Sequence, residues 1–135
     1  MLHLPIDILQ NFMVEVFTRI GVPHDDARIC SEILIASDLK GIESHGIGRL
    51  KMYYDRIKLG IQQPVTRIDV VRSRYATAVW DGNHGMGHVV AQKAMLEAID
   101  KAGKYGLGAV AVRNSTHYGI CGYYSELATR HDMIG

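Results

Sequence analysis

One stretch of the chain constrains the fold more than any other, because residues 76–112 carry a strand, a turn, a helix and a second strand in succession. The strand Ala-Thr-Ala-Val-Trp ends at position 80, and the glycine-rich turn Asp-Gly-Asn-His-Gly-Met-Gly follows it. An Ala-rich helix is predicted over residues 88–102, and the apolar run over 107–112 is typical of a buried parallel strand. Strand, helix and strand in this order predict an α/β sheet.

Three helices are predicted before this unit. Apolar residues recur at three- and four-residue steps over residues 6–20, which is one face of an amphipathic helix. A second helix runs over residues 23–41, with proline and two acids at its start and glycine at its end. A third apolar series covers residues 47–61 and begins after Ser44, which can serve as its N-cap.

We therefore predict an α/β chain with an N-terminal three-helix segment over residues 1–66 and the first part of an α/β domain over 67–135. A strand over 68–72 precedes the strand over 76–80, and a last helix follows residue 119. The sheet is expected to be mixed or parallel, with covering helices. Only three strands can be counted, so we expect an unfinished sheet in a truncated chain.

The overall charge excludes proteins that bind nucleic acid mainly through a basic surface, since 15 Lys and Arg face 14 Asp and Glu. Residues 40–74 nevertheless hold eight basic and three acidic side chains. Three helices followed by a strand pair is also the order of a winged helix, whose third helix would carry four bases: Arg49, Lys51, Arg56 and Lys58. This DNA-binding alternative stays open, although the strand, helix and strand that follow have no place in such a minimal module. We expect no nucleic-acid partner.

The two cysteines, Cys30 and Cys121, lie far apart inside apolar helical patterns and lack the spacing of a zinc site. We expect both to be reduced core thiols. No stretch approaches the roughly 18 apolar residues that span a membrane, and the start of the chain lacks the pattern of a signal peptide. A cytoplasmic protein without a membrane partner is expected.

The first candidate site is the segment Glu-Ser-His-Gly-Ile-Gly-Arg at positions 43–49. At about 100° of rotation per residue, His45 and Arg49 share the exposed face of the predicted third helix. The Arg49 guanidinium suits a carboxylate, His45 can exchange a proton with an adjacent oxygen, and the helix N-terminus favours an anion. The alternative is a solvated helix face capped by Ser44.

The second candidate site is the segment Asn-Ser-Thr-His-Tyr-Gly-Ile-Cys-Gly at positions 114–122, which directly follows the predicted buried strand. Ligands of open α/β sheets gather at the carboxyl ends of the strands, so His117 lies where a substrate would bind. Gly119 and Gly122 allow a close approach at a cost of ~1 kcal/mol each in helix stability. The alternative is a capped turn in which His117 packs locally.

Two further patterns are weak. Gly85-Met-Gly87-His-Val-Val90 lacks the third glycine of a dinucleotide fingerprint, and no acid ends the next strand. His84 and His88 are four positions apart, yet the spacing supplies no third metal ligand. We predict no metal site.

Three segments taken together resemble the malate/L-lactate dehydrogenase family, which also contains ureidoglycolate, sulfolactate and diketogulonate enzymes. They are Asp-Leu-Lys-Gly-Ile-Glu-Ser-His-Gly-Ile-Gly-Arg-Leu at 38–50, Ala-Thr-Ala-Val-Trp-Asp-Gly-Asn-His-Gly-Met-Gly at 76–87, and Val-Ala-Val-Arg-Asn-Ser-Thr-His-Tyr-Gly at 110–119 with Gly-Tyr-Tyr at 122–124. The similarity covers essentially the whole chain in order. This family is distinct from the Rossmann-fold lactate and malate dehydrogenases.

The resemblance implies that NAD(P)H passes a hydride to a small 2-oxo acid in a homodimer whose nucleotide-binding sheet is not a Rossmann fold. It also implies that 67–135 is the first part of the cofactor-binding domain, with most cofactor-binding residues beyond position 135. The cofactor can be NAD or NADP. Because family members are more than twice as long, the chain is expected to be an N-terminal portion, and a non-catalytic fragment is an alternative.

Carried over by position, the family's serine–histidine pair falls on Ser44 and His45, its carboxylate-binding arginine on Arg49, and its second active-site histidine on His117. The resemblance thus implies that Ser44 and Arg49 bind the substrate. One histidine is then the general acid for the carbonyl oxygen, while Arg49 holds the carboxylate. The proximity of Arg49 favours His45 as the acid.

Overall fold

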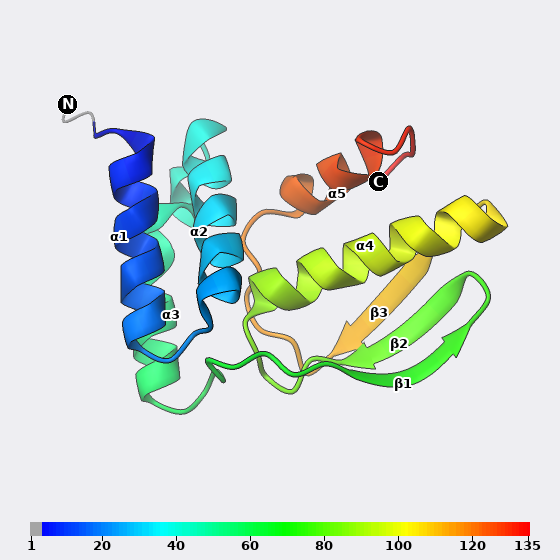
Figure 1. Ribbon diagram of the computed structural model, residues 1–135, viewed down its shortest axis with the longest axis horizontal. Helices are drawn as coiled ribbons and strands as arrows, with labels where there is room; N and C mark the ends of the chain where they lie inside the picture. The colour runs from blue at the N-terminus through cyan, green and yellow to red at the C-terminus, as the bar shows by residue number, and fades with distance from the viewer. Residues whose placement is uncertain (1–3) are drawn as a thin grey trace.

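The computed structural model describes residues 4–135, which form five α-helices, two short 3₁₀ turns and one three-stranded sheet (Figure 1). In chain order the elements are α1 (Ile6–Arg19), α2 (His24–Leu39), η1 (Glu43–His45), η2 (Ile47–Arg49), α3 (Leu50–Lys58), β1 (Asp69–Arg74), β2 (Thr77–Asp81), α4 (Gly87–Tyr105), β3 (Ala109–Arg113) and α5 (Cys121–Thr129). The first three helices pack together at one end of the molecule, and α4 lies along the sheet at the other. None of the helices within 4–135 has the length and apolar character needed to cross a membrane.

The third helix differs from the sequence prediction, because α3 begins at Leu50 rather than after Ser44. Residues 43–49 instead form η1 and η2, separated by Gly46 in an extended conformation. The Asp38 carboxylate accepts a hydrogen bond of 2.8 Å from the backbone N–H of Ile47, and a Cβ atom at Gly46 would overlap that carboxylate. This contact holds the two turns against α2 and prevents one continuous helix.

Of the two sheet types expected, mixed or parallel, the structure has the mixed one, with strand order β1-β2-β3. The first pair is antiparallel, and a bulge lies between Val70 and Arg72. The second pair is parallel, with Thr77 opposite Ala109. The prediction that the last strand is buried is wrong, because its residues alternate between exposed and half-buried. Since α4 covers one face of the sheet (Figure 1), it shields only alternate side chains of β3.

The main hydrophobic core joins the helical segment to the start of α4. Met86 and Val89 are fully buried in the same cluster as Phe17, Leu34 and Tyr53. Burying a side chain of this size stabilises the folded state by about 1.5–3 kcal/mol. Residues 4–66 and 67–135 therefore share a core rather than packing separately.

Both cysteines are free thiols, but only one of them lies in the core. Cys30 is fully buried in α2, as predicted. The prediction of a core position is wrong for Cys121, which is exposed at the first residue of α5. The reason is that Cys121 lines an open groove between α4, β3 and α5, while the buried face of α5 is formed further along the helix.

Candidate active site

The structure brings the four residues singled out in the sequence into one group. His45 and His117 stack with their ring centroids 5.4 Å apart and their planes inclined by 25°. The Ser44 hydroxyl lies 2.9 Å from Nδ1 of His45, and Nε of Arg49 donates a hydrogen bond of 2.6 Å to the Ser44 carbonyl oxygen. Both histidines are half-buried. Two segments far apart in the sequence thus place two imidazoles and a guanidinium side by side.

The local geometry of Ser44 and Arg49 corrects two predictions. Ser44 does not cap α3, because its hydroxyl contacts the His45 ring and no side chain caps that helix. His45 and Arg49 do not share one regular helix face, since one lies in η1 and the other ends η2. The bond from Arg49 to the Ser44 backbone replaces helical geometry and fixes the guanidinium next to the serine–histidine pair.

The loop that carries His117 is held by the glycine-rich turn before α4. The Thr116 hydroxyl donates to the Gly85 carbonyl oxygen at 2.7 Å and accepts from the Gly87 N–H at 2.9 Å. A Cβ atom at Gly87 would overlap the carbonyl oxygens of Thr116 and His117. The pattern that resembles a weak dinucleotide fingerprint therefore serves here to let two backbones approach closely.

Two residues that sequence reasoning missed are linked to His117 by hydrogen bonds. The Tyr53 hydroxyl lies 2.6 Å from Nδ1 of His117 and 3.1 Å from Nε2 of His88, and both Tyr53 and His88 are fully buried. Tyr53 follows Arg49 by four positions, and this spacing is the signal that could have found it. His88 gave no such signal, because its contact with Tyr53 is between segments 35 positions apart.

Burial sets the protonation states of this group. Loss of hydration lowers the pKa of His88 to about 3, and the neighbouring His117 acts in the same direction. Burial also lowers the pKa of His117, with His45 and Arg49 adding to the effect. The pKa of Tyr53 is raised above its usual range, again chiefly by burial. At neutral pH, His88 is therefore a neutral imidazole and Tyr53 keeps its hydroxyl proton.

The buried carboxylate of Asp81, at the end of β2, holds the start of the His117 loop through hydrogen bonds. Asp81 accepts hydrogen bonds from the Asn83 N–H at 2.9 Å, from Asn114 at 2.9 Å and from Nε of Arg113 at 2.8 Å. These bonds lower the pKa of Asp81, the backbone N–H of Asn83 having the largest effect. Asp81 therefore fixes the point where the chain leaves β3 toward His117.

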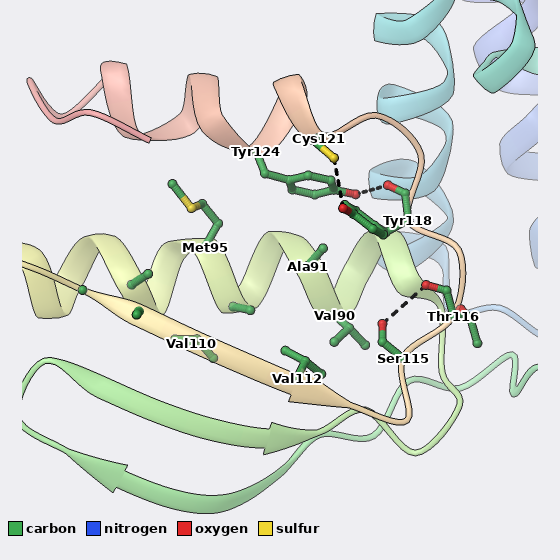
Figure 2. A pocket seen from close by; sticks show the side chains of 14 residues that line it. Val90, Ala91, Met95, Val110, Val112, Ser115, Thr116, Tyr118, Cys121 and Tyr124 are labelled. Carbon is green, nitrogen blue, oxygen red and sulfur yellow. Dashed lines mark hydrogen bonds between the residues drawn. The ribbon is translucent and has the colours of Figure 1, made fainter.

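Next to the His117 loop lies an open groove of about 610 Å³ between α4, β3 and α5. Figure 2 shows its mostly apolar walls, to which α4 contributes Val90 and Met95 and β3 contributes Val112. At one side, the Tyr118 hydroxyl lies 3.0 Å from the Cys121 thiol. This volume falls within the range of small-molecule and cofactor pockets.

The histidine pair His84 and His88 does not form a metal site. The side chain of His88 is buried against Tyr53, whereas His84 is exposed in the turn. Within the described part of the chain, no group of three His, Cys, Asp or Glu side chains could hold a metal ion.

Comparison with known proteins gives consistent matches along the chain. The family model described as malate/L-lactate dehydrogenase matches residues 4–135. The chain is 50% identical to a malate dehydrogenase of Pyrococcus abyssi over 133 residues, which are 98% of this chain and 37% of that protein. It is 48% identical to an L-sulfolactate dehydrogenase of Methanocaldococcus jannaschii over 126 residues, covering 93% of this chain and 37% of that protein.

Solved structures agree with these sequence matches. The malate dehydrogenase of Pyrococcus horikoshii superposes with a TM-score of 0.94 at 44% identity, over 96% of this chain and 37% of that one. The sulfolactate dehydrogenase of M. jannaschii gives a TM-score of 0.93 at 46% identity, over 96% of this chain and 38% of that one. The chain thus spans little more than a third of the length of these relatives. None of these matches supports the winged-helix alternative, and Tyr53 of its would-be recognition helix is buried in the core.

Proposed function

The chain belongs to the malate/L-lactate dehydrogenase family, and we propose that it forms the N-terminal part of an NAD(P)-dependent oxidoreductase. The proposed reaction interconverts a small 2-hydroxy acid and the corresponding 2-oxo acid. The relatives support this substrate class, because malate and sulfolactate are both 2-hydroxy acids. The observation that carries the proposal is the stacked pair of imidazoles, with Arg49 bonded to the serine beside them.

The nicotinamide cofactor supplies the hydride when it is bound. The groove beside the His117 loop fits part of such a cofactor, because its apolar walls suit a flat ring. The hydroxyls of Ser115 and Tyr118, which line the groove, are the polar groups that would contact it. NAD and NADP are both compatible with this proposal, since residues beyond position 135 of the family pattern would hold the rest of the nucleotide.

The chain's own residues divide the remaining work. Arg49 binds the carboxylate of the acid, because a guanidinium can donate two parallel hydrogen bonds to it. His45 donates its proton to the carbonyl oxygen during reduction and takes it back during oxidation. The ring of His117 stacks on that of His45, so His117 would contact the same oxygen. The Ser44 hydroxyl orients the His45 ring through Nδ1.

The substrate test uses the whole protein with NADH or NADPH and follows the loss of the reduced cofactor. Oxaloacetate and sulfopyruvate are tried first, because the basic side chains of residues 40–74 favour substrates with two negative groups. We expect turnover with at least one of them, and none with carbonyl compounds that lack an acidic group. Activity restricted to non-acidic carbonyl compounds would contradict the proposal. The homodimer and the cytoplasmic location stay predictions of the family resemblance and of the sequence.

A further inference from the structure

Three side chains next to the stacked imidazole pair are linked in series by hydrogen bonds, and they come from α4, α3 and the loop between β3 and α5. His88 of α4 contacts Tyr53 of α3 through Nε2 at 3.1 Å, and Tyr53 contacts Nδ1 of His117 at 2.6 Å. Nδ1 of His88 is buried and makes no hydrogen bond within the part of the chain that the structure describes. A buried imidazole costs free energy unless its polar atoms are used, so the contact with Tyr53 is the polar role of His88.

The direction of these hydrogen bonds follows from a backbone group. The Gly119 N–H donates to Nδ1 of His117 at 3.3 Å. Because a backbone N–H can only donate, Nδ1 of His117 carries a lone pair, and the proton of the neutral ring lies on Nε2. The Tyr53 hydroxyl then also donates to Nδ1, and its oxygen accepts from the Nε2–H of His88.

The surroundings of His117 oppose a positive charge on its ring. The titratable and charged side chains that act on it include no carboxylate. They are His45 of η1, Arg49 of η2, Tyr53 and Arg56 of α3, and His88 of α4. Partial burial acts in the same direction and is the largest cause of the lowered pKa of His117. The His117 imidazole is therefore neutral at neutral pH.

We propose that Tyr53 and His88 are positioning residues that hold His117 as a neutral hydrogen-bond donor, with its proton on Nε2. In this arrangement His117 keeps its proton throughout the reaction and polarises the carbonyl oxygen, while His45 transfers the proton. The kinetic consequence rests on the proposed function, whereas the tautomer of His117 does not.

The tautomer is tested by long-range ¹H–¹⁵N correlation spectra of histidine side chains at neutral pH, on the folded protein labelled at histidine. We expect a protonated Nε2 and an unprotonated Nδ1 for His117 and for His88. Tyr53→Phe keeps the ring but removes the hydroxyl, so only the longer bond from the Gly119 N–H remains on Nδ1, and we expect the His117 signals to move toward a mixture of the two tautomers. A His117 protonated on Nδ1 in the unaltered protein, or unchanged spectra in Tyr53→Phe, would overturn the proposal.

The role of His117 is tested by two substitutions in the whole dehydrogenase. His117→Gln keeps an N–H donor near the position of Nε2, so we expect kcat to stay within about 10-fold of the unaltered protein. His117→Leu removes the donor, and kcat should fall by roughly 10²–10³, the usual loss for one such donor. Equal and large losses in both variants would mean that His117 transfers the proton. Absence of any turnover in the unaltered protein would contradict the proposed function and leave the tautomer result standing.

The role of His88 is tested by a matched pair in the same assay. His88→Gln keeps a donor for Tyr53, whereas His88→Leu fills the space without one. We expect kcat to fall by about 2- to 10-fold in His88→Leu, the factor that one hydrogen bond corresponds to, and to be restored in His88→Gln. Val89→Ala, which weakens the same core but removes no hydrogen-bonding group, is the control for stability alone. A kcat that follows the measured stability across all three variants would show that His88 has only a structural role.

Discussion

The carbonyl oxygen of His117 lies against the Cα atom of Gly87, in the space that the side chain of any other residue would occupy. Gly87→Ala therefore forces apart the start of α4 and the His117 loop, although alanine favours a helix. We expect the free energy of unfolding to fall by about 1–3 kcal/mol, measured by urea denaturation. Gly103→Ala in the same helix is the matched control, because its Cβ atom would meet only the end of Met133 at 3.7 Å. That variant should gain up to about 1 kcal/mol.

Removing the proton of His45 should affect turnover more than binding. His45→Gln keeps polarity but cannot donate a catalytic proton, so we expect kcat of the whole dehydrogenase to fall by roughly 10²–10⁴ with little change in nucleotide affinity. The measurement is steady-state kinetics over a range of pH, together with a binding titration of NADH. Near-normal kcat and an unaltered pH profile would assign the general acid to another group, with His117 the first to examine.

Arg49 should show the opposite pattern. Arg49→Lys keeps the positive charge but loses the planar guanidinium that donates two parallel hydrogen bonds to a carboxylate. It also loses the hydrogen bond from Nε to the Ser44 carbonyl oxygen. We expect mainly a raised KM for the oxo acid, with a loss of about 1–3 kcal/mol in kcat/KM. A lysine variant with an unchanged KM would show that Arg49 does not bind the carboxylate. Lys51→Arg is a control at an exposed position, where Lys51 is paired with Asp55.

Buried histidine should make the stability of the fold depend on pH. The pKa of His88 is about 3 in the folded chain, whereas its ordinary value is 6.5. Between pH 6.5 and about 3, His88 therefore binds a proton in the unfolded chain but not in the folded chain. The stability that His88 contributes is present above pH 6.5 and is lost as the pH falls toward about 3. The slope approaches about 1.4 kcal/mol per pH unit.

Urea denaturation at about pH 7.5 and about pH 5 should therefore show a loss of roughly 2 kcal/mol from His88, with His117 adding in the same direction. In His88→Leu this part of the pH dependence should disappear. The depressed pKa of Asp81 contributes only at lower pH, because its stabilisation is lost below the ordinary range of a carboxyl. Equal pH dependence in the unaltered chain and in His88→Leu would contradict the burial argument.

The sequence predicted those features that local patterns determine. The helix predicted over 6–20 is α1, and the one predicted over 23–41 is α2, because periodicity and the flanking glycines and proline act within a few residues. The third helix was predicted to begin too early, because the break at Gly46 depends on the Asp38 carboxylate from another element. Such a contact has no signature in the local pattern.

The same distinction applies to the site. His45 and Arg49 were found by their four-residue spacing, although a hydrogen bond to Ser44 and not a helix face joins them. His117 was found by its place after a strand. Tyr53 and His88 were missed because their roles exist only after folding brings the Tyr53 side chain of α3 to the first turn of α4. A tyrosine next to the apolar series of a predicted helix and a histidine at the first turn of another helix look structural until the third partner is placed.

The contacts of Tyr53 in α3 with His88 and His117 give the fold a form of thermodynamic linkage. Tyr53 and His117 are 64 positions apart in the chain, so their contact forms only when the helical segment closes on the sheet segment. A substrate that bridges His45 and His117 would bind the closed arrangement alone, and would stabilise it by RT ln(1 + [L]/Kd). Substrate affinity is then coupled to the free energy of packing between residues 4–66 and 67–135. A substitution in their shared core would weaken substrate binding without contacting the substrate.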